Sequence, residues 1–365
     1  MVITKEAVLK ALGYVQDPDL NQDLVTLNMI KDVEVNGKKI AFTVVLTTPA
    51  CPLKEKIKND CLDAIAQHLG DDVEADINMT AEVTQNPNDL NNKIPNIKNI
   101  IAISSGKGGV GKSTVTSNLA VALANSGAKV GIIDADIFGP SIPTMFGVED
   151  AKPGIVEEDG KNMVLPIHRN GIKLISIGFL TPPDQAIVWR GPMASSALRQ
   201  FISDVQWGEL DYLLIDLPPG TSDIHLTLVQ AISITGAVVV TTPQKVALAD
   251  TQKGLAMFNQ SQIGVPIVGV IENMAYFTPA ELPDNKYYIF GQDGAKEFAE
   301  KNKVDFLGEV PLVQGIREAG DNGEPIAAHQ SVVSDTFDNI AQKVAQKVAI
   351  LNAKREPTKP VEIVE

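Results

Sequence analysis

Short apolar runs alternate with amphipathic stretches along most of the chain, beginning near Ile97. Apolar runs bounded by turn residues are typical of buried strands, and apolar residues three or four positions apart are typical of helices. The pattern predicts strands at 97–104, 129–133, 172–177, 211–216, 236–241, 265–271 and 304–308, and helices at 113–125, 193–206, 222–233, 248–262 and 293–302. Strands and helices in this alternation predict an α/β fold with a mainly parallel, doubly wound sheet.

The first 85 residues carry a different pattern. It predicts helices at 5–15 and 53–69 and strands at 30–35, 39–46 and 73–79. Asn36-Gly37 separates the first two of these strands, and an Asn-Gly pair in that position favours a β-hairpin. We therefore expect a small α+β domain at 1–85, a polar linker at 86–97, a larger domain at 98–353 and a polar tail at 354–365.

The last predicted helix, Ser334–Lys354, has a single apolar stripe. The stripe consists of Phe337, Ile340, Val344, Val348 and Leu351. An amphipathic helix can lie on a membrane surface or pack against a protein core. Because the stripe has the ordinary width for helix packing, we expect the helix to pack against the core.

Composition and charge narrow the possible partners and compartment. The formal net charge of -14 argues against a general nucleic-acid or acidic-membrane binder, whose affinity comes from many Lys and Arg contacts. The chain has 2 cysteines, Cys51 and Cys61, and its start does not resemble an export leader. No apolar run approaches the roughly 18 to 20 residues of a membrane span. We predict a cytoplasmic protein without a membrane span.

A glycine-rich turn follows the first strand of the larger domain. It consists of Gly106, Lys107, Gly108, Gly109, Val110, Gly111, Lys112 and Ser113, followed by Thr114. This is the G-x-x-x-x-G-K-[ST] phosphate-binding loop, in which glycines allow backbone N–H groups to point at phosphate oxygens. Lys112 is expected to reach the β- and γ-phosphates and Ser113 to ligate Mg²⁺. The larger domain is therefore predicted to be a P-loop NTPase.

The same glycines also satisfy a second motif. Gly106, Gly108 and Gly111 match the G-x-G-x-x-G turn of dinucleotide sites, and Asp134 lies about where such a site has its ribose-binding acid. Lys112 followed by Ser113 favours the magnesium nucleotide, because a pyrophosphate turn needs neither the cation nor the hydroxyl.

Carboxylates that end two predicted strands are candidates for metal binding and for activation of water. Asp216 precedes Leu217-Pro218-Pro219-Gly220 and is expected to be aimed at the Mg²⁺ ion. Asp134 and Asp136 end another strand, where one could hold the water shell of the metal and the other could orient or deprotonate the attacking water. Alternatively, such aspartates cap the following helix.

Several longer motifs carry a family resemblance. They are GKGGVGKST at 106–114, DADIFGPSIP at 134–143, WRGPM at 189–193, DLPPGTSD at 216–223, TTPQKVALAD at 241–250 and IENMAYF at 271–277. Together they resemble the Mrp (ApbC) iron-sulfur cluster carriers, which are deviant P-loop ATPases of the MinD, ParA and nitrogenase-iron-protein class. Residues 1–85, with DPDL at 17–20 and TTPACP at 47–52, resemble the small domain of iron-sulfur targeting proteins.

The resemblance implies a homodimeric ATPase that uses ATP and Mg²⁺, carries an iron-sulfur cluster and exchanges it with donor proteins and recipient apoproteins. It implies that Lys107 acts on the nucleotide of the partner subunit; the alternative is a solvated loop lysine. The predicted catalytic residues are then Lys107 together with Lys112, Asp136 and Asp216, which are expected from their positions. It further implies that Asn273 touches the adenine and that Pro311 closes the adenine pocket. The alternatives are a MinD/ParA-like positioning or scaffold protein without a cluster, and a nucleotide-binding metabolic enzyme.

One departure from the family concerns the cluster. Many carriers have a C-x-x-C pair after the NM motif, whereas residues 276–283 read YFTPAELP and no cysteine follows Cys61. Cluster ligation requires soft thiolates, so Cys51 is the remaining candidate ligand. It lies at a strand-to-helix turn, where the helix N-terminus is expected to lower its pKa. Cys61, inside the predicted helix, is expected to be a buried small hydrophobe.

Overall fold

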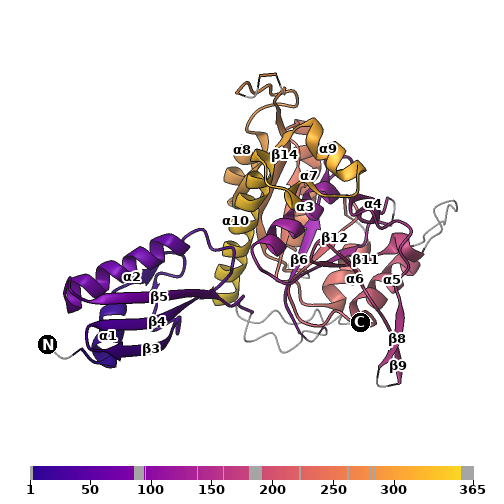
Figure 1. Ribbon diagram of the computed structural model, residues 1–365. Coiled ribbons are helices and arrows are strands. Elements are labelled where there is room, and N and C mark those ends of the chain that lie inside the picture. The colour runs from indigo at the N-terminus through magenta and orange to yellow at the C-terminus, as the bar shows by residue number, and fades with distance from the viewer. Residues whose placement is uncertain are drawn as a thin grey trace. The chain divides into compact units, whose positions relative to one another are not determined.

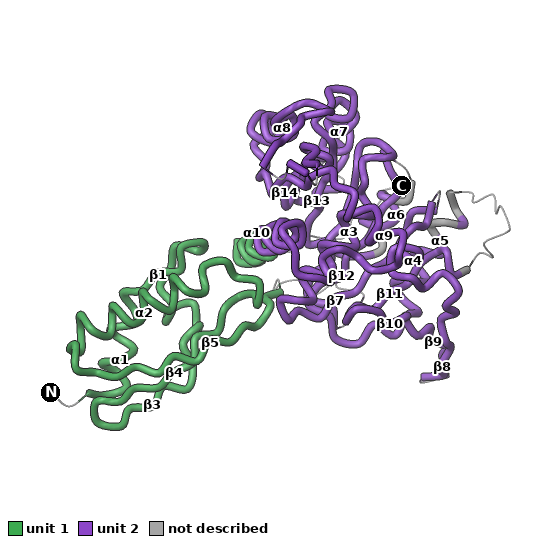
Figure 2. Tube along the Cα trace, turned by 45° about the horizontal axis from the view of Figure 1, so that its top comes forward, with its two compact units in different colours: residues 1–85, 345–355 green, residues 86–344, 356–365 purple. Residues whose placement is uncertain are grey.

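The computed structural model describes residues 3–85, 94, 96–137, 139–158, 160–180, 191–221, 223–260, 263–279, 281–282 and 284–354 (Figure 1). The chain divides into two compact units, one of residues 1–85 and 345–355 and the other of residues 86–344 and 356–365 (Figure 2). Almost all of the predicted linker and tail, and Trp189 and Arg190 of the WRGPM motif, lie outside the described residues. The domain boundaries expected from the sequence therefore stay predictions.

An eight-stranded sheet forms the centre of the larger unit. In sheet order its strands are β10 (Ile167–Arg169), β11 (Ile172–Ser176), β7 (Val130–Asp134), β12 (Leu210–Asp216), β6 (Ile97–Ser104), β13 (Gly236–Thr241), β14 (Ile267–Phe277) and β15 (Phe306–Leu312). Every neighbouring pair is parallel except β10 and β11. This confirms the predicted parallel sheet, and the carboxyl ends of its parallel strands meet at one edge.

Helices cover both faces of this sheet (Figure 1). The main ones are α3 (Lys112–Asn125), α5 (Gly191–Ser203), α6 (Asp223–Ala231), α7 (Lys245–Phe258), α8 (Gly294–Asn302) and α10 (Val332–Lys354). On one face, Ile100 and Ala102 of β6 share a core cluster with Phe201 of α5. Successive strand residues point to opposite faces, and Ile101 and Ile103 are buried on the other. The doubly wound fold is thus confirmed.

Several short elements were not predicted. They are the hairpin β8–β9 (Ile155–Glu158 and Lys161–Val164), strand β10, helices α4 (Ile142–Met145) and α9 (Gln314–Asp321), and the 3₁₀ helices η1 (Ile177–Leu180) and η2 (Ile326–Ala328). None of these elements exceeds 8 residues. A strand or helix this short contains too few apolar positions to show a period of 2 or 3.6 residues, so apolar spacing cannot identify it.

The smaller unit has the predicted α+β composition. Its elements are α1 (Lys5–Leu12), β1 (Gln16–Asp17), β2 (Gln22–Asp23), β3 (Ile30–Asn36), β4 (Lys39–Leu46), α2 (Lys54–Leu69) and β5 (Glu74–Ala81). The Asn36-Gly37 turn joins β3 and β4 as predicted, with Asn36 paired to Lys39 and Gly37 at φ 67°. Strand β5 pairs in parallel with β4, so α2 is the crossover between them.

The C-terminal helix α10 buries its apolar stripe, as expected. Phe337, Ile340, Val344 and Val348 are each at most 1% exposed. Ile340 packs on β15, where a Cβ added to Gly308 would lie 2.9 Å from Ile340 Cγ1. None of the helices in the described part of the chain combines the length and the apolar character that crossing a bilayer requires.

The last turns of α10 belong to the smaller unit. Gln346 Nε2 donates a hydrogen bond to Asp19 Oδ1 at 2.6 Å, and Asn352 Nδ2 donates to the carbonyl of Thr84 at 2.9 Å. Sequence patterning assigned this stretch to the larger domain, because helical periodicity continues through it without a break.

Candidate nucleotide site

The glycine-rich loop occupies residues 105–111, between the end of β6 and the start of α3 at Lys112. Strand β6 lies between β12 and β13, so the loop lies at the edge where carboxylates of neighbouring strands also end. Gly109 and Gly111 have φ of 79° and 80°, in the left-handed region that glycine tolerates best. Gly111 is also the N-cap of α3, so the helix N-terminus faces the loop.

Gly106 is required for a reason that the motif does not reveal. A Cβ at this position would lie 2.3 Å from the backbone of Asp250 and Thr251 in α7. That distance is far inside van der Waals contact, so any side chain here would displace the loop or α7. Close packing of two backbones, rather than phosphate binding alone, therefore explains this glycine.

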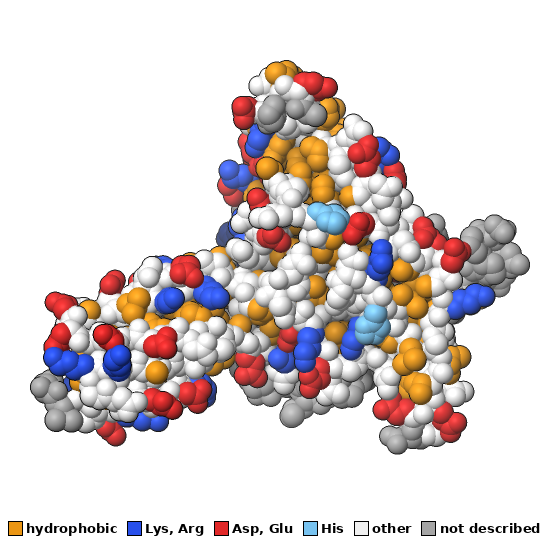
Figure 3. All heavy atoms as spheres, in the orientation of Figure 1, with side chains coloured by type: hydrophobic (Ala, Val, Ile, Leu, Met, Phe, Trp, Pro, Cys, Tyr) orange, Lys and Arg blue, Asp and Glu red, His pale blue; other side chains and the backbone are white. Residues whose placement is uncertain are grey.

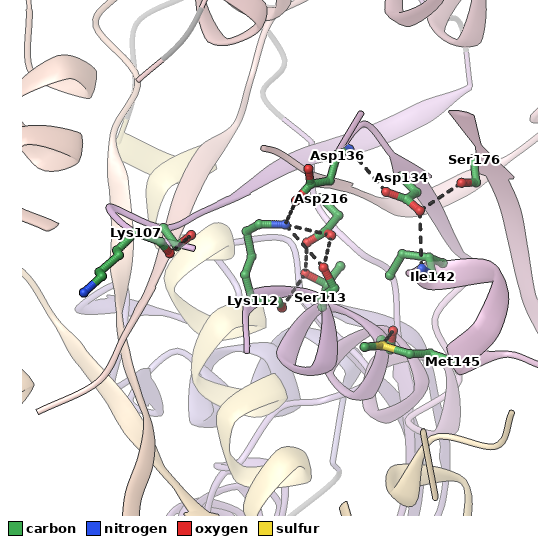
Figure 4. A network of polar contacts seen from close by, with 12 residues as sticks. Lys107, Lys112, Ser113, Asp134, Asp136, Ile142, Met145, Ser176 and Asp216 are labelled. Carbon is green, nitrogen blue, oxygen red and sulfur yellow. Dashed lines mark hydrogen bonds and ion pairs between the residues drawn. The ribbon is translucent and has the colours of Figure 1, made fainter. Parts of the chain in front are cut away.

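Lys112 and Asp216 form the centre of the site (Figure 4). Lys112 Nζ lies 2.8 Å from Asp216 Oδ2 and 3.5 Å from Asp136 Oδ2. Ser113 Oγ donates a hydrogen bond to Asp216 Oδ2 at 2.6 Å. Asp216 is fully buried and Lys112 is 6% exposed, so these charges interact with little screening by solvent.

Thr116 is a member of this cluster that sequence reasoning missed. Its Oγ1 lies 2.6 Å from Asp216 Oδ1 and 3.0 Å from the carbonyl of Lys112, and the residue is fully buried. Asp216 therefore has one oxygen held by Ser113 and Lys112 and the other held by Thr116. The position one helical turn after Lys112 was the available sequence clue, because residues four apart on a helix share a face.

Asp134 has the geometry of the capping alternative. Its Oδ2 accepts hydrogen bonds from Ser176 Oγ at 2.8 Å and from the Ile142 N–H, at the start of α4, at 3.3 Å. Its Oδ1 accepts from the Asp136 N–H at 3.2 Å. Burial, followed by the charge of Asp216, raises the pKa of Asp134 to about 8. This fully buried carboxyl group holds three segments together.

Asp136 lies on the open side of the cluster. It is 9% exposed and borders a cavity of about 200 Å³. The same cavity is lined by Lys107, Gly108, Gly109, Gly111, Lys112, Ser113 and Thr114. Of the two aspartates that end β7, Asp136 is thus the one that borders this space.

Ser113 lines this cavity, and the buried Asp216 is hydrogen-bonded to Ser113; the two side chains supply oxygen ligands that fit Mg²⁺. The Ser113 hydroxyl and the Asp216 carboxylate converge within 2.6 Å, and Mg²⁺ prefers one or two such ligands with the remainder supplied by phosphates and water. Among the residues that the structure describes, no group of three or more His, Cys, Asp or Glu side chains is arranged to hold a metal.

Lys107 points away from the Lys112 and Asp216 cluster (Figure 4). It is exposed, and its carbonyl accepts a hydrogen bond from Ser105 Oγ at 3.1 Å. Its ammonium group is therefore directed to solvent and not to the phosphate side of its own loop.

A second, larger cavity of about 580 Å³ adjoins the loop. Asn273 and Pro311, the two residues expected at an adenine pocket, both line it, together with Met274, Leu312, Val313 and Ile316. Figure 3 shows apolar side chains gathered over the region that Figure 1 labels β14 and α9. Gly111 and Thr114 line both cavities, so a ligand could extend from one to the other.

The two cysteines differ in their surroundings. Cys61 is fully buried, which confirms the expectation of a small hydrophobe, and burial raises its pKa to about 12. Cys51 is half-buried. The expectation of a lowered thiol pKa at Cys51 was wrong: burial raises it, and the charges of Asp19 and Asp17 add to the increase. Desolvation of the thiolate outweighs the favourable backbone contact at Leu53.

Tyr276 and Phe277 begin the 276–283 segment, and both contact aromatic residues that follow that segment. Phe277 pairs with Tyr287 in an antiparallel bridge, Tyr276 packs edge-on against Tyr288, and Lys286 Nζ lies 3.9 Å from the centroid of the Tyr276 ring. Tyr287 and Tyr288 are 46% and 41% exposed. Ala280 and Pro283 of this segment lie outside the described residues.

Comparison with known proteins identifies the larger part of the chain. The family described as NUBPL iron-transfer P-loop NTPase matches residues 96–346. The chain belongs to this family. A second family, described as iron-sulfur cluster assembly protein, matches residues 5–77. The resemblance inferred from the motifs is thereby confirmed for both parts of the chain.

Individual relatives and solved structures are also similar to this chain. An iron-sulfur cluster carrier protein of Synechocystis is 48% identical over 352 residues, covering 96% of this chain and 99% of the relative. A nucleotide-binding protein of Archaeoglobus fulgidus, solved in complex with ADP, is 43% identical with a TM-score of 0.54 over 62% of this chain and 87% of that one. The cell division ATPase MinD of Pyrococcus furiosus is 25% identical with a TM-score of 0.50 over 67% of this chain and 98% of that one.

Proposed function

We propose that the protein is an ATP-binding and ATP-hydrolysing iron-sulfur cluster carrier that delivers clusters to recipient apoproteins. The observation that carries the ATPase part is the convergence of Lys112, Ser113 and Asp216 at the carboxyl edge of the sheet. The cargo is proposed from the relatives, among them a protein named iron-sulfur cluster carrier that matches almost the whole chain.

In this proposal the triphosphate lies along the loop from Gly106 to Thr114, with the base in the 580 Å³ cavity beside Asn273 and Pro311. Lys112 exchanges its contact with Asp216 for the β- and γ-phosphates, and the ammonium stabilises charge that develops during phosphoryl transfer. Ser113 and Asp216 would hold Mg²⁺, which neutralises phosphate charge. Asp136, on the open side, would orient the attacking water.

Lys107 is proposed to act in a homodimer. Because its side chain leaves its own loop for solvent, it is available to a nucleotide bound by a second copy of the chain. An ammonium supplied across a dimer interface would add a second positive charge at the transferring phosphoryl group, as an arginine finger does in other NTPases.

The cluster is the proposed cargo of the protein. The two thiols of the chain limit how a cluster could be ligated. Cys61 is fully buried, whereas Cys51 is half-buried, so Cys51 is the proposed contact. One thiol per chain is too few for a cluster that is usually held by four. Cluster binding through Cys51 would therefore need a second copy, or thiols from a donor or recipient.

The second candidate function is a MinD/ParA-like positioning or scaffold protein without a cluster. The observation that favours it is the aromatic segment around Tyr276 and Tyr287 in place of the C-x-x-C pair. An exposed aromatic surface suits protein contacts better than metal binding.

Anaerobic reconstitution with iron and sulfide separates the two functions. A carrier is expected to gain visible absorbance and labile iron, and to activate an apo-protein that needs a cluster. Cys51→Ser should lose both properties, and Cys61→Ser is the matched control because its thiol is fully buried. If the wild type gains no labile cluster and transfers none, the carrier proposal fails while the ATPase proposal stands.

The proposed setting is the cytoplasm, with iron-sulfur donors and recipient apoproteins as partners and without nucleic acid. The net charge of -14 supports the last point. On the face shown in Figure 3, Lys and Arg side chains are interspersed with Asp and Glu, and such a surface offers no continuous basic track for a phosphate backbone.

A further inference from the structure

Asn273 contacts the phosphate-binding loop directly. Its Nδ2 donates a hydrogen bond to the carbonyl of Val110 at 2.8 Å, and the side chain is buried at 5% exposure. The two residues are far apart in sequence, and the contact joins β14 to the loop that follows β6. A contact with adenine, which is the role expected from family resemblance, does not require this bond.

The backbone on both sides of the contact has an uncommon conformation. Gly111 has φ 80°, and a Cβ there would lie 2.2 Å from Asn273 Nδ2. On the other side, Met274 has φ 55°, and the pairing of β14 with β15 shifts register between Asn273 and Phe277. Left-handed backbone at a non-glycine residue is costly and persists where surrounding contacts impose it. The loop at Gly111 and the part of β14 at Met274 therefore both adopt left-handed backbone next to the Asn273 amide.

The bond to Val110 also fixes the direction of a loop N–H. In a planar trans peptide the carbonyl and the following N–H point in opposite directions. With the Val110 carbonyl held by Asn273, the Gly111 N–H is directed to the opposite side. Val110 and Gly111 line the 200 Å³ cavity and Asn273 does not, whereas Asn273 lines the 580 Å³ cavity. Gly111 also lines the larger cavity, so the cavities alone do not orient this N–H; the Val110 carbonyl does, because it points to Asn273 and the Gly111 N–H therefore points away from Asn273.

We infer that Asn273 is a positioning residue for the phosphate-binding loop and not only a contact for the base. An Asn amide has a second N–H and a carbonyl oxygen, so one side chain can hold Val110 and also contact a base in the cavity that it lines. Occupation of the base cavity is thereby linked to the orientation of a phosphate donor. The inference rests on the proposed nucleotide site and gives Asn273 a second role in it.

A ligand without a base distinguishes the two roles. Binding of magnesium tripolyphosphate and of MgATP is measured by calorimetry on the full chain, for the wild type, Asn273→Asp and Asn273→Ala. Neither variant can donate to Val110, so both should bind both ligands about tenfold more weakly, the size expected for one lost buried hydrogen bond. They should also lower kcat for MgATP as well as raise KM, because the misdirected N–H no longer serves the transition state.

Ile316→Ala is the matched control. Ile316 lines the base cavity from α9 and does not line the phosphate cavity. Its truncation should weaken MgATP binding while leaving tripolyphosphate binding unchanged. Circular dichroism and thermal melting establish that each variant is folded, and the alanine variant serves if the aspartate variant does not fold.

The inference is overturned if either folded Asn273 variant binds tripolyphosphate as the wild type does, because the side chain would then contact only the base. It is also overturned if the wild type binds MgATP but has no affinity for tripolyphosphate. A wild type that binds neither ligand contradicts the proposed nucleotide site itself, so the two failures can be told apart.

Discussion

Thr116 illustrates how a residue without a motif can matter at the site. Its buried Oγ1 lies 2.6 Å from Asp216 Oδ1, on the side of the carboxylate opposite Ser113. A carboxylate that ligates Mg²⁺ needs a fixed orientation, and partners behind a ligand supply it. Thr116 is therefore expected to position Asp216 without touching the nucleotide.

Thr116→Val keeps the shape of the side chain and removes the hydroxyl. We expect the Mg²⁺ concentration for half-maximal ATPase activity to rise by about tenfold, in the range known for lost partners of metal ligands. The measurement is a magnesium titration at saturating ATP, with Ser126→Ala as control because Ser126 ends α3 away from the loop and bonds to Leu123. An unchanged magnesium dependence would contradict the positioning role.

Alkylation rates of the two cysteines test whether burial raises the pKa of each thiol. Burial raises the pKa of Cys51 from its usual value of 9.0, and that of Cys61 to about 12. Because the thiolate is the nucleophile, Cys51 of the cluster-free protein should react with iodoacetamide at pH 8 more slowly than a free thiol, with a rate that still increases above pH 9. Cys61 should react only after denaturation. Rapid alkylation of Cys51 near pH 7 would indicate a lowered pKa instead.

Among the secondary-structure elements, helix α8 has a buried carboxylate, that of Glu272, hydrogen-bonded to its first turn. Glu272 of β14 is 1% exposed and accepts a hydrogen bond from the Ala295 N–H in the first turn of α8. This contact satisfies one of the free N–H groups at the helix start. Burial, with smaller effects from Glu309 and Asp293, raises the pKa of Glu272 from 4.5.

The raised pKa predicts how stability changes with pH. Above pH 4.5 the folded protein retains a proton on Glu272 that the unfolded chain releases, so this residue's contribution to stability decreases as pH rises through the raised pKa. Glu272→Gln keeps an acceptor for Ala295 and removes the titration. The free energy of unfolding of the variant, relative to wild type, should therefore increase between pH 5 and pH 8 in urea titrations. A difference independent of pH would show that the pKa of Glu272 is not raised.

At the scale of the whole molecule, the proposed trans action of Lys107 predicts complementation. Lys112→Ala should abolish hydrolysis, and Lys107→Ala should abolish it while nucleotide binding persists. In a mixed dimer, the subunit with Lys107→Ala keeps its own Lys112 and receives Lys107 from its partner. An equal mixture should regain about a quarter of the wild-type rate, because half of the dimers are mixed and one of their two sites is complete.

Each variant assayed alone at the same total concentration is the control. Recovery of activity on mixing supports action between subunits. Full activity of Lys107→Ala alone would show that the lysine is an ordinary solvated loop residue, and activity of Lys112→Ala alone would contradict the assignment of the phosphate-binding loop.

The order of apolar and polar residues and the glycine motif were sufficient to predict the fold and the P-loop NTPase family. Alternating apolar runs and helices specified the parallel sheet, because a strand buried on both faces requires apolar residues throughout. The spacing from Gly106 to Ser113 specified a phosphate-binding loop, since its geometry is local to one strand, one turn and one helix. The geometry of such a loop depends on residues close together in the chain, so it can be predicted without the tertiary structure.

Contacts between distant segments became known only from the folded chain. It brought Thr116 to Asp216, Asn273 to Val110 and the backbone of α7 against Gly106. It also reversed the expected pKa shift of Cys51, because desolvation depends on what surrounds a group in space and not on its position in a turn. Contacts and burial of this kind arise from chain packing, so no spacing along the sequence specifies them.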